Sequence, residues 1–207
     1  MKRNGILIIV SGFSGAGKGT LVKKLIEDYE GYALSVSATT RQPRPGEEEG
    51  REYFFLQKEQ FERMIAEDGL IEHACYCDNY YGTPRAYVES QIAQGRDVIL
   101  EIEIQGALKV REKYADALLL FVMPPSAEEL RRRLVGRGTE TEEVVAKRMC
   151  RAAEEAQGIE QYDYIVINDD LDTCVRQLHE IITAAHNTPG RNREFIENIR
   201  TELEGEK

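Results

Sequence analysis

The sequence lacks any long apolar run, since no stretch approaches the roughly 18 consecutive apolar residues that a membrane-spanning helix needs. The first ten residues combine a basic pair with a short apolar stretch, as a signal peptide does. They lead directly into a glycine-rich loop, however, and not into a small-residue cleavage site, so we interpret them as a buried strand. We therefore expect no membrane association and a cytoplasmic location.

Cysteine is also scarce, with four residues in the 207-residue chain: Cys75, Cys77, Cys150 and Cys174. They are too few and too irregularly spaced for a disulfide framework. Cys75 and Cys77 form a C-x-C pair, but no second pair and no well-spaced histidines complete a structural metal site. We expect these two cysteines on one face of a strand.

The chain has fewer basic than acidic residues, with 27 lysines and arginines against 37 aspartates and glutamates, which gives a net charge of -10. Proteins that grip a nucleic-acid backbone normally present a basic surface, so we predict no nucleic-acid partner. A nucleotide needs only a local cluster of cations, and the placement of the arginines therefore matters more than the total. The oligomeric state is not predicted by any feature of the sequence.

Short apolar runs alternate with helical patterns along the chain. Each run is nearly continuous and rich in leucine or β-branched residues, as in strands that are covered on both faces. The runs are Ile6–Val10, Val98–Ile102, Leu118–Met123 and Tyr164–Ile167. Apolar stripes at helical spacing start at Leu21, Leu130 and Leu171. This alternation predicts an α/β fold with a parallel sheet.

Two segments depart from this alternation. The stretch 35–87 is turn-rich and holds short mixed strands with a short helix, which indicates a lobe inserted between core strands. The stretch 126–157 is helical and highly charged, as a mobile lid would be, and the end of the chain is polar and expected to be loose. The predicted divisions are a core with a phosphate loop at 1–34, the inserted lobe at 35–87, core at 88–125, the lid at 126–157, core at 158–186 and a C-terminal tail at 187–207.

A phosphate-binding loop follows the first predicted strand. The chain reads Gly12-Phe-Ser-Gly-Ala-Gly-Lys18, a G-x-x-x-x-G-K pattern with a strand before it and a helix after it. Glycines let backbone N–H groups converge on an anion at a helix N-terminus, and the lysine adds its charge to the β- and γ-phosphates. The predicted ATP contacts are Gly12, Phe13, Ser14, Gly15, Ala16, Gly17, Lys18, Gly19 and Thr20.

The loop departs from the common pattern directly after its lysine. The usual Ser or Thr, whose hydroxyl binds Mg²⁺, is replaced by Gly19, and Thr20 follows. Thr20 is the candidate magnesium ligand, directly or through water. We therefore predict Mg²⁺, bound together with ATP, as the cofactor.

The inserted lobe carries the motifs that narrow the family. The run from Ser35 to Tyr53 closely resembles the guanylate kinase signature, and Glu72 and the run Asn79–Thr83 resemble the next two motifs of that family. Later segments around residues 124, 136 and 166 are also similar, so that the resemblance covers essentially residues 4–186. It implies a P-loop NTPase-type three-layer core of parallel strands, with an inserted GMP-binding lobe and a helical lid.

The resemblance also implies roles for single residues. The GMP phosphate would be held by Arg41, Arg44, Tyr53 and Tyr81, since guanidinium forks suit paired phosphate oxygens. The guanine edge would be read by Ser37, Glu72 and Thr83, because a carboxylate accepts from donors that adenine lacks. In the lid, Arg133, Arg137 and Arg148 would act with Lys18 as catalytic residues by offsetting charge on the transferring phosphoryl group. Asn168 would lie near the adenine or ribose of ATP.

Two acidic residues and several lid arginines leave alternatives open. Glu101 and Glu103 lie two positions apart, which places both on one face at the carboxyl end of a strand. Glu101 would organise magnesium and its waters and Glu103 would contact the GMP base, or both are merely solvated. The lid arginines would otherwise form i,i+4 pairs with Glu128, Glu129 or Glu142. Of Tyr80 and Tyr81, one belongs to the core, and the resemblance favours Tyr81 as the ligand.

The reaction implied is transfer of the γ-phosphoryl group of ATP to GMP, giving ADP and GDP. Three alternatives remain: a kinase for another nucleoside monophosphate, a catalytically silent guanylate-kinase-like module that binds proteins, and a signalling GTPase. Glu72 and Thr83 count against the first and the intact Gly17 and Lys18 against the second. The third should show an Asn-Lys-x-Asp motif, which the chain lacks at Asn168.

Overall fold

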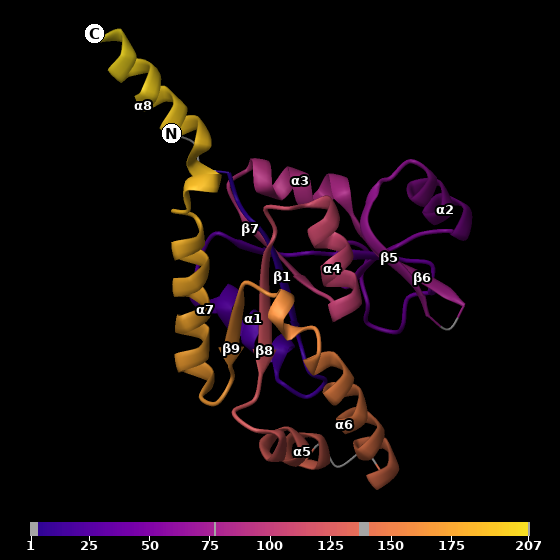
Figure 1. The fold of residues 1–207 in the computed structure, drawn as a ribbon. Helices are drawn as coiled ribbons and strands as arrows, with labels where there is room; N and C mark the ends of the chain where they lie inside the picture. The colour runs from indigo at the N-terminus through magenta and orange to yellow at the C-terminus, as the bar shows by residue number, and fades with distance from the viewer. Residues whose placement is uncertain (1–3, 77, 137–140, 207) are drawn as a thin grey trace.

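The computed structural model describes residues 4–76, 78–136 and 141–206. Its main sheet has five parallel strands in the order β2-β7-β1-β8-β9 (Figure 1). The strands are β1 (Leu7–Gly12), β2 (Tyr32–Leu34), β7 (Asp97–Glu101), β8 (Leu118–Met123) and β9 (Tyr164–Ile167). The predicted parallel α/β sheet is confirmed. Within the part of the chain that is described, none of the helices combines the length and apolar character that a bilayer crossing needs.

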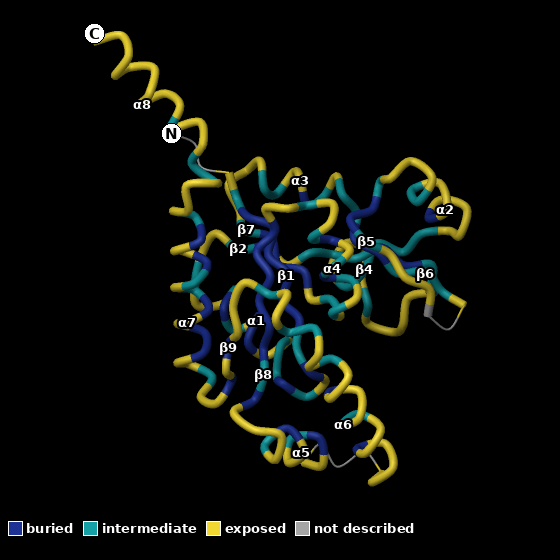
Figure 2. Tube along the Cα trace, viewed as in Figure 1, coloured by how far each residue is buried: buried dark blue, intermediate teal, exposed yellow. Residues whose placement is uncertain are grey.

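Helices cover both faces of this sheet, which makes the three layers predicted from the sequence. Along β1 the side chains alternate between the faces, so Ile8 packs with α1 (Lys18–Asp28) and α7 (Leu171–Ala185). Its neighbour Ile9 packs on the opposite face with α3 (Arg85–Ala93) and α4 (Ile104–Lys113). Figure 2 shows the resulting buried centre of the sheet inside largely exposed helices.

The edge strand β9 differs from the prediction of a strand covered on both faces. Val166 is buried, but Tyr164, Ile165 and Ile167 are each more than two-fifths exposed. The reason is position, because β9 pairs only with β8 at the end of the sheet. Apolar composition predicted the strand correctly, but composition alone does not separate an edge strand from a central one.

A second sheet of four strands lies within the predicted lobe. Its order is β4-β3-β6-β5, with β3 (Ser37–Thr39), β4 (Tyr53–Phe55), β5 (Leu70–Tyr76) and β6 (Asn79–Pro84). Together with α2 (Lys58–Ala66) it encloses a small core of Ala38, Phe61 and Leu70. Cys75 lies exposed in β5, whereas Cys77 lies outside the described residues, so the expectation of a shared strand face stays a prediction.

Two charged helices follow β8, as predicted for residues 126–157. They are α5 (Ala127–Gly136) and α6 (Glu142–Ala156), and the short helix η1 (Ile159–Gln161) connects them to β9. The polar tail, which was expected to be loose, is helical, since η2 (Pro189–Asn192) and α8 (Arg193–Gly205) continue beyond α7. Figure 1 shows α8 extending away from the body. The sequence of α8 is rich in helix-forming residues and carries an i,i+3 ion pair between Glu197 and Arg200. The polar composition of this segment did not by itself indicate a helix.

Candidate functional site

The glycine-rich loop joins β1 to α1 at the carboxyl edge of the main sheet, where ligands of open α/β sheets bind. Gly12 lies so close to β8 that an added Cβ would be 2.1 Å from the Val122 carbonyl oxygen. Gly17 caps α1 in the left-handed region, with a φ of 87°. The first turn of α1 holds no acidic residue, so its N–H groups and dipole remain available to an anion.

Lys18 folds its side chain back over this loop. The ammonium donates to the Gly12 carbonyl at 2.6 Å and to the Phe13 carbonyl at 3.2 Å. The charge is therefore held at the rim of the loop, where backbone N–H groups and the start of α1 converge. The role of Lys18 on the phosphates of ATP stays a prediction.

Glu101 ends β7 directly beside the first turn of α1. Its Oε2 lies 3.8 Å from the place that a Cβ on Gly19 would take, next to where most phosphate loops present a hydroxyl. Loss of hydration raises the pKa of Glu101, and the nearby Lys18 charge partly offsets that rise. Thr20 is exposed on the same turn of α1.

These oxygens fit a magnesium ion that arrives with a nucleotide. Magnesium usually keeps several waters and takes one or two carboxylates together with substrate phosphates. Glu101 supplies one such carboxylate beside the loop. No group of three or more His, Cys, Asp or Glu side chains suited to a metal occurs among the described residues, so a site made by protein ligands alone is not seen there.

Asn168 lies against the phosphate loop and not at an open face. The side chain is 7% exposed, and its amide donates to the Ala16 carbonyl at 2.8 Å. A Cβ on Gly17 would be 2.6 Å from the same amide nitrogen. The predicted contact with adenine or ribose stays a prediction, and what the structure adds is a hydrogen bond that fixes the loop to the end of β9.

The lid arginines lie around the same loop. Arg133 of α5 donates to the Asn168 carbonyl at 2.8 Å and to the carboxylate of Glu129, the i,i+4 partner that the sequence left open. Arg132 also binds Glu129, and the two guanidiniums lower the pKa of that carboxyl to about 2. Arg148 of α6 donates to the Ser14 hydroxyl at 3.0 Å. The prediction for Arg137 lies outside the described residues.

The expectation that Glu101 and Glu103 share one strand face is wrong, because β7 ends at Glu101 and the chain turns into α4 at Glu103. Whereas Glu101 lies by the phosphate loop, Glu103 caps α4 and forms an ion pair with Arg151 of α6. Arg151 also binds Glu155 at 3.0 Å. We did not predict Arg151 from the sequence, although its spacing of three from Arg148 places both on one side of a helix.

In the second sheet, Glu72 and Thr83, both predicted to read the guanine edge, lie in contact with each other. They lie on the antiparallel strands β5 and β6, and the Thr83 hydroxyl donates to Glu72 Oε1 at 2.9 Å. Thr83 is fully buried, and burial raises the pKa of Glu72 despite that hydrogen bond. The pairing of Ala38 with Gly82 places Ser37 next to Thr83 in the register of β3 and β6.

The remaining predicted ligands of the lobe form a second group. The guanidinium of Arg41 lies 5.5 Å from the centre of the Tyr53 ring, and the Tyr53 and Tyr81 rings meet edge to face at 6.0 Å. Arg44 is exposed on the turn between β3 and β4. Tyr80 instead stacks on Phe61 in the core of the lobe, which agrees with Tyr81 as the residue left for a ligand.

Glu47 joins this group, although we did not predict it from the sequence. Its carboxylate receives two hydrogen bonds from the Arg41 guanidinium and one from the Arg44 backbone N–H. These contacts lower the pKa of Glu47, with the Arg41 side chain as the largest cause. The available signal was its acidic character on a turn with two arginines, but two further glutamates follow it directly.

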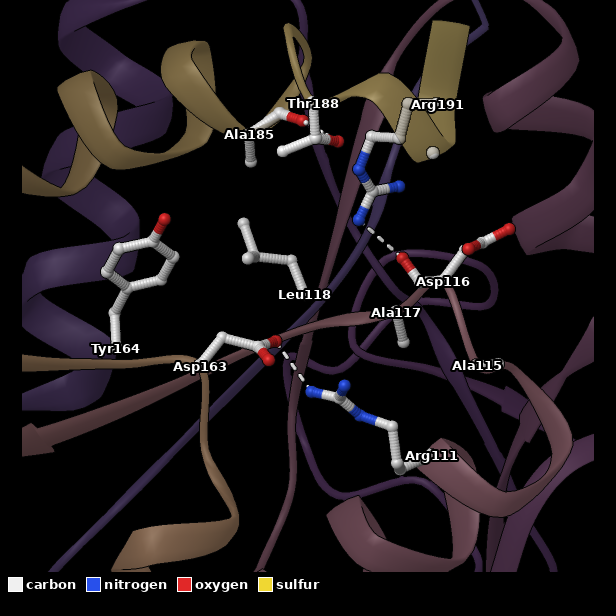
Figure 3. Close-up of a pocket in the computed structure, with 11 residues that line it drawn as sticks. Arg111, Ala115, Asp116, Ala117, Leu118, Asp163, Tyr164, Ala185, Thr188 and Arg191 are labelled. Carbon is white, nitrogen blue, oxygen red and sulfur yellow. Dashed lines mark hydrogen bonds and ion pairs between the residues drawn. The ribbon is translucent and has the colours of Figure 1, made fainter. Parts of the chain in front are cut away.

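A hollow of about 380 Å³ lies elsewhere, at the amino ends of β8 and β9 (Figure 3). Both of its guanidinium groups are engaged: Arg111 pairs with Asp163, and Arg191 donates to the Asp116 carbonyl. Ligands of parallel α/β sheets bind at the opposite, carboxyl edge. The candidate site is therefore the phosphate loop together with the second sheet.

Comparison with known proteins finds relatives along nearly the whole chain. The family model described as guanylate kinase matches residues 4–185. A guanylate kinase from Caldanaerobacter subterraneus subsp. tengcongensis is 50% identical over 202 residues, covering 98% of each chain. One from Halalkalibacterium halodurans is 52% identical over 185 residues, covering 89% of this chain and 91% of its own. A crystal structure of guanylate kinase from Anaplasma phagocytophilum superposes with a TM-score of 0.70 at 34% identity, covering 95% of each chain.

Proposed function

The chain belongs to the guanylate kinase family, and we propose on this premise that it transfers the terminal phosphoryl group of ATP to GMP, giving ADP and GDP. The observation that supports the proposal is the contact between Glu72 and Thr83 in the lobe, in which the buried Thr83 hydroxyl donates to the Glu72 carboxylate. A carboxylate there accepts from the N1–H and N2–H₂ donors of guanine, which adenine does not have. We also propose that the enzyme acts in the cytoplasm.

We propose that the two nucleotides bind end to end. The ATP phosphates would lie on the loop Gly12–Thr20, with Lys18 at the β- and γ-phosphates. The GMP phosphate would lie on Arg41, Arg44, Tyr53 and Tyr81, and the guanine edge on Ser37, Glu72 and Thr83. Glu103 would reach the base after release from Arg151, and Asn168 would support ATP binding by holding the loop. The inserted lobe 35–87 and the helices of 126–157 would then close over the substrates.

The reaction needs positioning and charge neutralisation more than covalent chemistry. A GMP phosphate oxygen is already anionic near neutral pH, so it attacks the γ-phosphorus in line without a general base. Lys18, Arg133, Arg137 and Arg148 would offset the charge that spreads over the equatorial oxygens. Closure of the inserted lobe and of the helices of 126–157 would exclude water, which otherwise competes with GMP as the acceptor.

Magnesium would be held by Glu101 and Thr20, directly or through water. When it is bound, it neutralises charge on the β- and γ-phosphate oxygens. Glu101 must lose its proton before it can bind a cation, and burial, which raises its pKa, makes that loss harder than for an exposed carboxyl.

The test is GDP formation in a coupled assay with ATP, comparing GMP with AMP, CMP and dTMP, for the wild type and Lys18→Ala. We expect GMP to be the preferred acceptor and Lys18→Ala to lose about 10²-fold or more in kcat, as expected when a group acting on the transition state is removed. Lys23→Ala is the matched control, since Lys23 is exposed on the same helix. Near-wild-type turnover by Lys18→Ala, or preference for another monophosphate, would contradict the proposal.

A further inference from the structure

We propose that Glu47 is a positioning residue for the acceptor phosphate, acting through Arg41 and the turn that carries Arg44. The inference rests on the proposed function, because it concerns the phosphate site of GMP. It assigns a negatively charged side chain a favourable role beside a negatively charged substrate, which charge alone would not suggest.

The first support is the number of bonds that Glu47 makes. One terminal nitrogen of Arg41 donates to Oε1 at 2.9 Å and to Oε2 at 3.0 Å. Oε2 also accepts from the Arg44 backbone N–H at 2.7 Å, and the Glu47 N–H donates to the Arg44 carbonyl at 3.0 Å. The carboxylate is therefore part of the turn itself, and it cannot rotate without breaking bonds at both arginines.

The second support is burial. The side chains of Arg41 and Glu47 are 16% and 18% exposed, unlike the other ion pairs on this turn. Glu48 and Arg51, for comparison, are 68% and 56% exposed. An exposed pair contributes little to stability, whereas a shielded pair with several hydrogen bonds keeps its geometry. The ring of Tyr53 beside the guanidinium adds a further constraint.

The consequence for binding follows from the flexibility of arginine. An unconstrained arginine loses rotamer freedom whenever it grips a phosphate, and that loss weakens the binding. Glu47 holds Arg41 in one orientation before the substrate arrives. The other terminal nitrogen of Arg41 donates to the neighbouring Gln42 carbonyl, an exposed contact that a phosphate oxygen would replace.

The alternative role for Glu47 is repulsion or competition, in which its carboxylate occupies the place of the phosphate. The two roles predict opposite signs. If Glu47 positions Arg41, its removal raises KM for GMP, whereas if it competes, its removal lowers KM. The sign of one kinetic parameter therefore separates them.

The experiment measures initial rates with both substrates varied, for the wild type, Glu47→Gln, Glu47→Asp and Glu48→Gln. Glu48→Gln is the matched control, with the same charge change on the same turn but at a carboxylate that pairs with Arg51 instead. We expect Glu47→Gln to raise KM for GMP roughly tenfold, the scale for ordering one or two side chains on binding, with kcat and KM for ATP nearly unchanged. Glu47→Asp keeps the charge but loses reach, so it should raise KM as well.

Arg41→Lys, alone and with Glu47→Gln, completes a double-mutant cycle. Because Glu47 acts largely through Arg41, the effect of Glu47→Gln should shrink in the Arg41→Lys background, leaving the part that acts through the Arg44 turn. A fall in KM, an effect equal to that of Glu48→Gln, or an undiminished effect in the Arg41→Lys background would each overturn the inference. A wild-type chain that forms no GDP would refute the proposed function, whereas GDP formation with a silent Glu47→Gln would refute only the role of Glu47.

Discussion

Replacing Glu72 with glutamine should separate base recognition from folding. Glutamine has nearly the same shape, and its carbonyl can still accept the Thr83 hydroxyl, which lies 2.9 Å from Glu72 Oε1. The other half of the amide becomes an N–H₂ donor that faces the N–H donors of guanine. A hydrogen bond to a charged group contributes about 1.5–3 kcal/mol, and an unpaired donor adds a penalty, so we expect a loss of about 3 kcal/mol, or roughly 10²-fold in kcat/KM for GMP.

Stability should respond in the opposite direction. Burial raises the pKa of Glu72 above its ordinary value of 4.5, so the native state holds this proton more readily than the unfolded state does. The native state therefore binds more protons between the two pKa values, and the free energy of unfolding falls as pH rises through that window. At a pH above this window the raised pKa of Glu72 costs the wild type stability, a cost that glutamine does not have. Glu72→Gln should melt no lower than the wild type at pH 7, and its relative advantage should shrink as pH falls through the raised pKa.

The assay compares GMP and AMP as acceptors, together with thermal unfolding at pH 7 and at several lower pH values. We expect the rate with AMP to change little, so that the preference for guanine falls by roughly the same 10²-fold. An equal loss with both acceptors would refute the assignment of Glu72 to the base. A lower melting temperature at pH 7 would refute the electrostatic reasoning, since it would mean that the carboxylate stabilises the lobe.

Two further predictions concern the phosphate loop. Gly17→Ala should lower stability by about 1–3 kcal/mol and abolish most activity, because the added Cβ meets the Asn168 amide at 2.6 Å in the left-handed region. Gly190→Ala, with nothing within 4 Å of its added Cβ, is the control, and equal melting temperatures for the two variants would contradict the reasoning. Asn168→Ala should raise KM for ATP several-fold by freeing the Ala16 carbonyl, with KM for GMP unchanged; equal rises in both would contradict a role at the loop.

The features that could be predicted from the sequence are those with a local signal. The phosphate loop is one of them, because its glycines, lysine, preceding strand and following helix are contiguous in the chain. The pairing of Glu72 with Thr83 was predicted as a shared role from resemblance, and the antiparallel register of β5 and β6 supplies its geometry. The buried strands were also predicted, since β1 is apolar from Leu7 to Val10 and β8 is apolar through all its buried positions.

The features that were missed depend on relationships that a local pattern does not contain. β9 is exposed because it is the edge strand of the sheet, and the order of strands in a sheet cannot be predicted from the sequence of one strand. The helix α8 was obscured because polar composition is typical of both loose tails and solvated helices. Arg151 is one of many charged residues in α6. It meets Glu103, 48 positions earlier in the sequence, only because the fold places α6 beside the start of α4.

The role of Glu47 could not be predicted for a different reason, because its partners Arg41 and Arg44 are close in the sequence and were themselves predicted as ligands. An acidic residue three positions from one arginine and six from another would ordinarily be interpreted as a solvated charge or as repulsion toward a phosphate. What changes that interpretation is the turn geometry, which directs both carboxylate oxygens inward and shields the pair. Whether a charge opposes or assists an anion site therefore depends on whether its own hydrogen bonds are already satisfied by the cations of that site, a property of the folded turn.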